Sequence, residues 1–212
     1  MRRHIEGFLN EAEFCLECAK RPVSCFEAVK WENKGSVKAG FVMVALFFIT
    51  MVIRAQLTGF IFNTQNPDNF SVINVFAVTV GGFAVAFAAH YAVSTFLPSE
   101  ATLRQLFITL SYPLLPLIIT RLIFVIASNL VAVEMQPFLL MLDFGGIGWA
   151  LIILVLGMIQ THRLSFGMVL GDLALTAFGA GIILFFMLLL FSLFQQLYIF
   201  FYTILSEVMF RL

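Results

Sequence analysis

Charged side chains are scarce in this sequence, and their scarcity excludes a soluble domain. Asp, Glu, Lys and Arg make up 11% of the 212 residues, whereas a soluble domain carries about 25%, enough to cover its surface with groups that water solvates. Hydrophobic residues make up 61% of the chain, and 26 residues are Phe. Most of the outer surface must therefore face hydrocarbon, which indicates an integral membrane protein.

The sequence also lacks the short motifs of common enzyme sites. It contains no nucleotide-binding loop, no hydrolase nucleophile elbow and no HExxH metal motif. Gly145, Gly146 and Gly148 lie inside an apolar window with no strand before them, so they do not form a phosphate-binding loop. We therefore expect no catalytic residues, no cofactor, no bound metal and no nucleic-acid partner.

The first 37 residues form a separate polar segment. Residues 1–38 hold seven of the twelve Lys and Arg and six of the twelve Asp and Glu. The first residues contain neither the apolar region of a signal peptide nor a small-residue cleavage site, so we expect no cleaved signal peptide. An apolar stripe at helical spacing predicts two short amphipathic helices, separated at Arg21-Pro22. We expect them to pack on the cytoplasmic face of the bundle or on a partner, with burial in the lipid interface as the alternative.

All three cysteines, Cys15, Cys18 and Cys25, lie in this polar segment. A cytoplasmic location predicts reduced thiols instead of a disulfide. Together with His4 they have the residue types of a zinc site, but their spacing is incomplete.

Five windows are long and apolar enough to cross a bilayer, which takes about 20 residues. They lie at roughly 38–60, 72–96, 106–130, 137–160 and 171–194. The apolar sequence continues past Gln195 and Gln196 to Phe210, which predicts a C-terminal interfacial or protruding helix after the fifth span. The predicted fold class is an all-α membrane protein, with a cytoplasmic segment at 1–37 and a five-helix transmembrane domain at 38–212.

The basic residues predict the orientation. Nine Lys and Arg lie on the side of the N-terminus, including Arg104 and Arg163, and Arg211 is alone on the other side. The positive-inside rule therefore predicts a multi-pass protein of the cell membrane, with a cytoplasmic N-terminus and an extracytoplasmic C-terminus.

Two opposite charges lie within the third and fourth windows. Arg121 is near the middle of its window, where an arginine costs at least about 3 kcal/mol and needs partners or water. Asp143 enters the fourth window from the same outer side, so we predict an Arg121–Asp143 pair inside the bundle. Such a pair is either a structural clamp that fixes helix register or part of a substrate or ion site.

Three other polar residues lie within or at the ends of the windows. Arg54 is close enough to the outer end of the first window to extend to the interface. Asp172 is expected at the interface, at the inner end of the fifth window. His90 is either a group that titrates near neutral pH or, as we favour, a packed side chain bonded to a neighbouring helix. Separately, Tyr112, Pro113 and Pro116 predict a helix break in the third window.

Several motifs together resemble a known family. Phe26-Glu-Ala-Val-Lys30 precedes the first window, and Leu57-Thr-Gly-Phe-Ile-Phe-Asn63 follows it. Ser111-Tyr-Pro-Leu-Leu-Pro116, Thr161-His-Arg-Leu-Ser165 and Glu207-Val-Met-Phe-Arg211 come later in the chain. This ordered set resembles the bacterial branch of the Yip-domain family of polytopic membrane proteins, whose eukaryotic founders are Ypt/Rab-interacting proteins.

The resemblance implies five spans, a cytoplasmic N-terminus and a non-catalytic role. The acidic and glycine-rich elements of the eukaryotic members are not evident here, so binding of small GTPases is not carried over. We interpret the chain as a membrane scaffold or adaptor that lies among lipids and binds another membrane protein or a transporter complex, with homo-oligomerisation open. The alternative is a small permease, channel or transporter subunit that uses the intramembrane charges.

Overall fold

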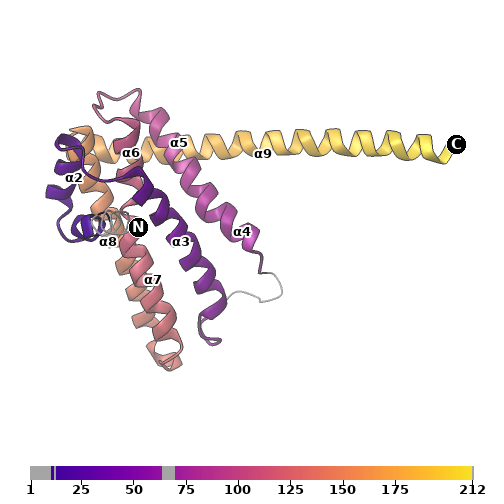
Figure 1. Cartoon of the computed structure of the whole chain (residues 1–212). Coiled ribbons are helices and arrows are strands. Elements are labelled where there is room, and N and C mark those ends of the chain that lie inside the picture. The colour runs from indigo at the N-terminus through magenta and orange to yellow at the C-terminus, as the bar shows by residue number, and fades with distance from the viewer. Residues whose placement is uncertain (1–10, 12, 64–69, 212) are drawn as a thin grey trace, which may run out of the picture.

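The computed structural model describes residues 11, 13–63 and 70–211 (Figure 1). This part of the chain is helical and contains no β-strand. Five helical segments in it are long and apolar enough to cross a membrane. They are Val37–Leu57, Val72–Ser94, Leu103–Ser128, Val133–His162 and Phe166–Glu207. The predicted fold class, an all-α membrane protein with five such helices, is confirmed.

Local capping explains where two of these segments begin. Helix α3 (Val37–Leu57) follows Ser36, whose hydroxyl oxygen accepts a hydrogen bond from a backbone N–H in the first turn. Helix α6 (Leu103–Ser111) follows Thr102, which forms a capping box with Gln105. Each cap provides a partner for a backbone N–H that a helix start otherwise leaves unpaired.

The middle segments are interrupted helices. The second consists of α4 (Val72–Phe76), a π-helical stretch (Ala77–Gly81) and α5 (Gly82–Ser94). The third consists of α6 and α7 (Leu114–Ser128), and the fourth of a 3₁₀ turn (Val133–Met135) and α8 (Gln136–His162). Helix α7 packs against both α3 and α8, so these three helices form the centre of the bundle (Figure 1).

The N-terminal segment packs on the bundle. Helix α2 (Pro22–Trp31) lies against α8 and buries Phe26 and Val29 completely. The ring of Phe26 covers Gly157 of α8 so closely that a methyl group on this glycine would lie 2.9 Å from the ring. The apolar face of the segment is therefore part of the core of this protein, which agrees with packing on the bundle.

Helix α9 (Phe166–Arg211) is the longest element, and most of it lies outside the bundle (Figure 1). Its first part packs against α5, where a methyl group built on Gly179 would lie 3.7 Å from the side chain of Ala89. Beyond this contact it extends away from the other helices. The helix predicted after Gln195 continues the fifth span without a break, because no Pro or Gly follows Gly181 to end α9.

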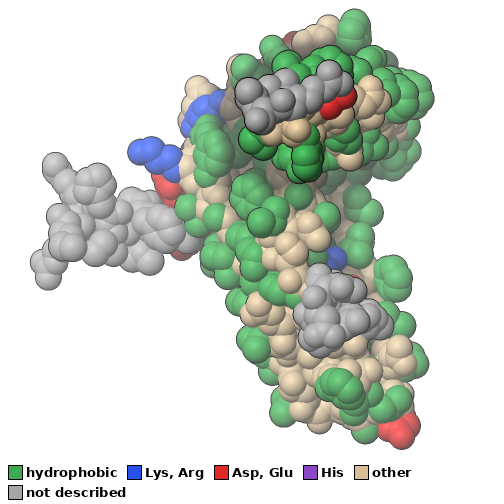
Figure 2. Space-filling model, turned by 90° about the vertical axis from the view of Figure 1, so that its right-hand side faces the viewer, with side chains coloured by type: hydrophobic (Ala, Val, Ile, Leu, Met, Phe, Trp, Pro, Cys, Tyr) green, Lys and Arg blue, Asp and Glu red, His purple; other side chains and the backbone are tan. Residues whose placement is uncertain are grey.

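The surface is apolar, as a membrane protein requires. Figure 2 shows hydrophobic side chains over most of the face that it presents, with few charged groups among them. None of the residues in the most apolar window of α9 is buried. Such a surface is stable only when hydrocarbon or another apolar protein surface covers it.

Candidate functional site

The first polar cluster inside the bundle joins α3, α7 and α8. Arg54 of α3 donates two parallel hydrogen bonds to the Asp143 carboxylate of α8, from Nη1 to Oδ1 at 2.8 Å and from Nη2 to Oδ2 at 2.9 Å. This bidentate geometry is the strongest that an arginine and a carboxylate form. Arg54 therefore points inward, not outward to the interface as the sequence suggested.

Arg121 of α7 lies beside this pair. Its Nε is 3.9 Å from Asp143 Oδ1, an ion-pair distance without a hydrogen bond. The Arg121 Nη1 contacts the sulfur of Met51 at 3.5 Å. The structure thus brings Arg121 and Asp143 together, but Arg54 holds the carboxylate. The cluster carries two positive charges and one negative charge.

A cavity of about 490 Å³ reaches this cluster. It lies between α3, α4 and α7 and is bordered by the π-helical stretch. Arg54, Ser71, Asn74 and Thr79 give it a polar lining, and Phe124 packs under the Arg54 guanidinium at 4.6 Å from the ring centre. The cavity can therefore hold water or a small polar or anionic group next to Arg54.

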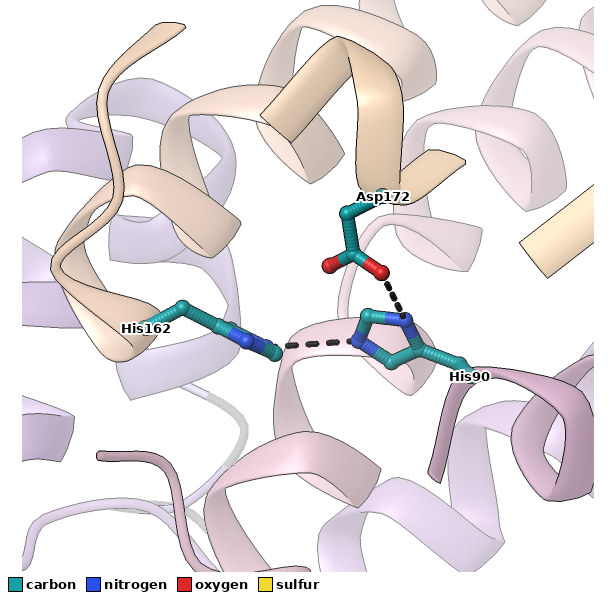
Figure 3. Close-up of side chains that lie close together, drawn as sticks. All are labelled: His90, His162 and Asp172. Carbon is teal, nitrogen blue, oxygen red and sulfur yellow. Dashed lines mark hydrogen bonds and ion pairs between the residues drawn. The ribbon is translucent and has the colours of Figure 1, made fainter. Parts of the chain in front are cut away.

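The second polar cluster is buried where α5, α8 and α9 meet. His90 of α5, His162 at the end of α8 and Asp172 of α9 have exposed side-chain fractions of 1%, 0% and 0%. His90 Nε2 is 3.3 Å from His162 Nε2, and His90 Nδ1 is 3.6 Å from Asp172 Oδ1. Figure 3 shows the three side chains converging from separate helices. Asp172 is thus deep in the protein, not at an interface, and His90 is packed against two neighbouring helices.

Two hydroxyl groups complete the second cluster. Ser99 Oγ lies 2.9 Å from His162 Nδ1, and Thr176 Oγ1 lies 3.3 Å from His90 Nδ1. The Thr176 hydroxyl also donates to Asp172 Oδ1 at 3.4 Å. All four imidazole nitrogens therefore have a polar neighbour.

The helix break in the third segment positions the N-terminal segment. The chain leaves α6 and enters α7 at Tyr112-Pro113, and Pro116 lies within the first turn of α7. The buried hydroxyl of Tyr112 accepts a hydrogen bond from the backbone N–H of Ser36 at 3.0 Å. Tyr112 thus joins the break to the start of α3.

The cysteines differ from expectation. The structure joins Cys18 and Cys25 as a disulfide, with Cα atoms 5.0 Å apart, where a cytoplasmic location predicts thiols. Cys15 is free and buried. Burial raises the pKa of the Cys15 thiol to about 11, and the charge of Glu11 acts in the same direction. His4 lies outside the described residues.

Sequence reasoning missed His162, Ser99 and Thr176. His162 carries a usable signal, because it lies just past the end of the fourth window, on the side where His90 lies and where the fifth window begins. Polar residues at one membrane depth on successive spans are candidates for contact. Ser99 and Thr176 carry no such signal, because hydroxyl groups are common in apolar helices and loops.

Fold and surface define the chain as a multi-pass, all-helical membrane protein with two polar clusters in its interior. A family model for the Yip1 domain matches residues 17–194, and the chain belongs to this family. Searches of curated proteins and of solved structures found no match. The Yip1 domain family is not known for enzymatic activity, and membership supports a non-catalytic membrane protein.

Proposed function

We propose that this protein is a membrane adaptor that binds a helix of another membrane protein through the outer half of α9. The observation that carries the proposal is an apolar helix that its own bundle leaves uncovered. Its 46 residues span about 69 Å at 1.5 Å each, more than twice the hydrocarbon thickness of about 30 Å. The length beyond the bundle is available to lipid and to a partner.

The outer half of α9 carries a polar stripe suited to a helix partner. Ser192, Gln196, Thr203 and Ser206 recur at i, i+4, i+11 and i+14, which places them on one face. The hydroxyls of Thr203 and Ser206 bond to the backbone of their own helix. In the described part of the chain the exposed amide of Gln196 has no hydrogen-bond partner. On so apolar a helix surface, an unpaired amide favours a polar group on another helix.

Site-specific photo-crosslinking in the native membrane tests this proposal. A photoreactive residue replaces either Gln196, on the stripe, or Phe194, which lies about 200° around the helix. We expect a defined crosslink to another membrane protein from position 196 and only lipid adducts from position 194. Co-purification of the same membrane protein in mild detergent should be lost in a chain truncated after Gly181 that still inserts into the membrane, which would locate the contact on α9.

Two results would contradict the adaptor. Lipid adducts alone from both positions would mean that lipid covers the stripe. A crosslink to a second copy of the chain would mean that α9 serves self-association. Binding should persist in Arg121→Ala, because the Arg121 guanidinium lies beside Asp143 of α8 and Met51 of α3, away from the outer half of α9.

A second candidate function is transport of a small polar solute or anion, which the cavity beside Arg54 favours. Without a cavity beside it, the buried Arg54–Asp143 pair would favour only a structural role in fixing the helices. Solute flux into liposomes that contain the purified protein tests this function, with Arg54→Met as the variant that removes the cavity charge. Flux equal to that of empty liposomes would rule it out.

We also propose that the protein lies in the cell membrane with a cytoplasmic N-terminus and an extracytoplasmic C-terminus. The excess of Lys and Arg on the N-terminal side supports this orientation. A reporter active only outside the cytoplasm should work when fused after Leu212 and fail when fused after Pro98. The redox state of Cys18 and Cys25 in the cell gives a second check of this orientation, because a reducing cytoplasm would keep both residues as thiols.

A further inference from the structure

We propose that His90, His162 and Asp172 form a binding site for a divalent transition-metal ion of the zinc class, which ties the start of α9 to α5 and α8. The three residues come from three helices, and all are buried. One donor atom from each lies within 4.8 Å of the others. Figure 3 shows both imidazoles and the carboxylate turned toward a common space.

The separation of the two imidazoles fits a shared metal ion. His90 Nε2 and His162 Nε2 are 3.3 Å apart. Two nitrogens bound to zinc at about 2.0–2.1 Å with tetrahedral angles lie about 3.3–3.4 Å apart. The two nitrogens are therefore already at the separation of two ligands of one ion.

The opposite ring nitrogens have the partners that metal-binding histidines use. A histidine that binds metal donates its other N–H to an oxygen, which fixes the tautomer and the ring orientation. Ser99 Oγ is in this position for His162 Nδ1 at 2.9 Å. Thr176 Oγ1, at 3.3 Å, and Asp172 Oδ1, at 3.6 Å, are in this position for His90 Nδ1. Both Nε2 atoms are thereby left to bind the ion.

Asp172 supplies an independent observation. Its Oδ2 is buried and has no hydrogen-bond partner among the described residues. A buried carboxylate without a full set of partners is costly. With Oδ2 as the third ligand, the metal ion balances this charge. A donor atom of Asp172 lies within 4.8 Å of one on each histidine, so a shift of the carboxylate toward the two Nε2 atoms would complete the site. An ion pair of Asp172 with a protonated His90 is the alternative that the experiment separates.

The ligand types select the class of ion. Two imidazole nitrogens and one carboxylate oxygen suit Zn²⁺ and similar ions. Ca²⁺ and Mg²⁺ prefer oxygen ligands alone, and Cu⁺ prefers sulfur. Because the three ligands lie on three helices, the bound ion holds the first turns of α9 in place while its outer half extends from the bundle.

Metal titration of the full-length protein in detergent tests the site. Protein stripped with a chelator is titrated with Zn²⁺ against a chromophoric competitor, and with Co²⁺ to record its ligand-field absorption. We expect one ion per chain and a tetrahedral Co²⁺ spectrum. We expect loss of this binding in His90→Ala and His162→Ala, and weakening of about 10-fold in Ser99→Ala, which removes only a partner of a ligand.

His4→Ala is the matched control, because it removes the remaining histidine of the sequence and should keep the ion. Size-exclusion profiles show whether each variant is folded. If the variants misfold, the Co²⁺ spectrum of the wild type still shows whether the protein binds the ion in a tetrahedral site. Absence of Zn²⁺ and Co²⁺ binding by the wild type would overturn the site and leave the His90–Asp172 ion pair. Unchanged binding in folded His90→Ala and His162→Ala would overturn it as well.

Discussion

The charge cluster between α3, α7 and α8 yields a ranked prediction about three substitutions. Asp143 is the one negative group of the cluster, and Arg54 and Arg121 are both positive. Asp143→Asn keeps the shape of the side chain but leaves two adjacent arginines without a counter-charge. Breaking a buried pair in this way costs 3–5 kcal/mol. Because 17% of the Asp143 side chain is exposed, we expect a value near the lower limit, about 3 kcal/mol.

The two arginines should differ in their effects. Arg54→Met removes two charge-assisted hydrogen bonds, but Arg121 remains 3.9 Å from Asp143. We expect a loss of about 1.5 kcal/mol. Arg121→Met removes the excess positive charge and a guanidinium whose Nε has no hydrogen bond within the described structure. We expect its free energy of unfolding to stay within about 1 kcal/mol of the wild type.

Unfolding in mixed micelles with increasing SDS, followed by circular dichroism, measures this order. Glu134→Gln is the matched control, because it makes the same acid-to-amide change at an exposed position and should be neutral. If Arg121→Met were the most destabilising variant and Arg54→Met were neutral, Asp143 would be held by Arg121. That result would refute the structural assignment and restore the pair predicted from the sequence.

Three further predictions concern the N-terminal segment. Gly157→Ala should destabilise the protein by about 1–3 kcal/mol, because the new methyl group would lie 2.9 Å from the Phe26 ring. A lower melting temperature would show this loss. An unchanged melting temperature would mean that α2 does not pack against Gly157. Tyr112→Phe should cost about 1 kcal/mol and speed proteolysis of the segment, because the N–H of Ser36 loses its acceptor; unchanged proteolysis would contradict this role. Since the pKa of Cys15 is raised from 9.0 to about 11, alkylation of Cys15 at pH 8 should be about 100-fold slower in folded than in SDS-unfolded protein, and should increase as the pH rises from 9 towards 11. The same shift should lower the free energy of unfolding above pH 9, because only the unfolded thiol ionises readily there; equal labelling rates at pH 8 would refute the burial.

The helices themselves could be predicted from the sequence. In lipid a backbone must satisfy its hydrogen bonds within each segment, so a window of about 20 apolar residues is already a helix. The helix break at Tyr112-Pro113 is equally local, because proline lacks the N–H that an α-helix requires. The motifs that resemble the Yip-domain family were also sufficient to predict the family, which the match over residues 17–194 confirms.

The partners of the buried polar groups depended on the tertiary structure. Which arginine holds Asp143 is decided by the rotation of α3 and α7 about their axes, and apolar windows do not encode this rotation. His90 lies 72 residues before His162 in the sequence, and it meets His162 and Asp172 only because α9 packs against α5 next to the end of α8. Hydropathy therefore determined that the chain forms membrane helices, while side-chain packing between helices decided which polar groups face each other and left the outer half of α9 uncovered.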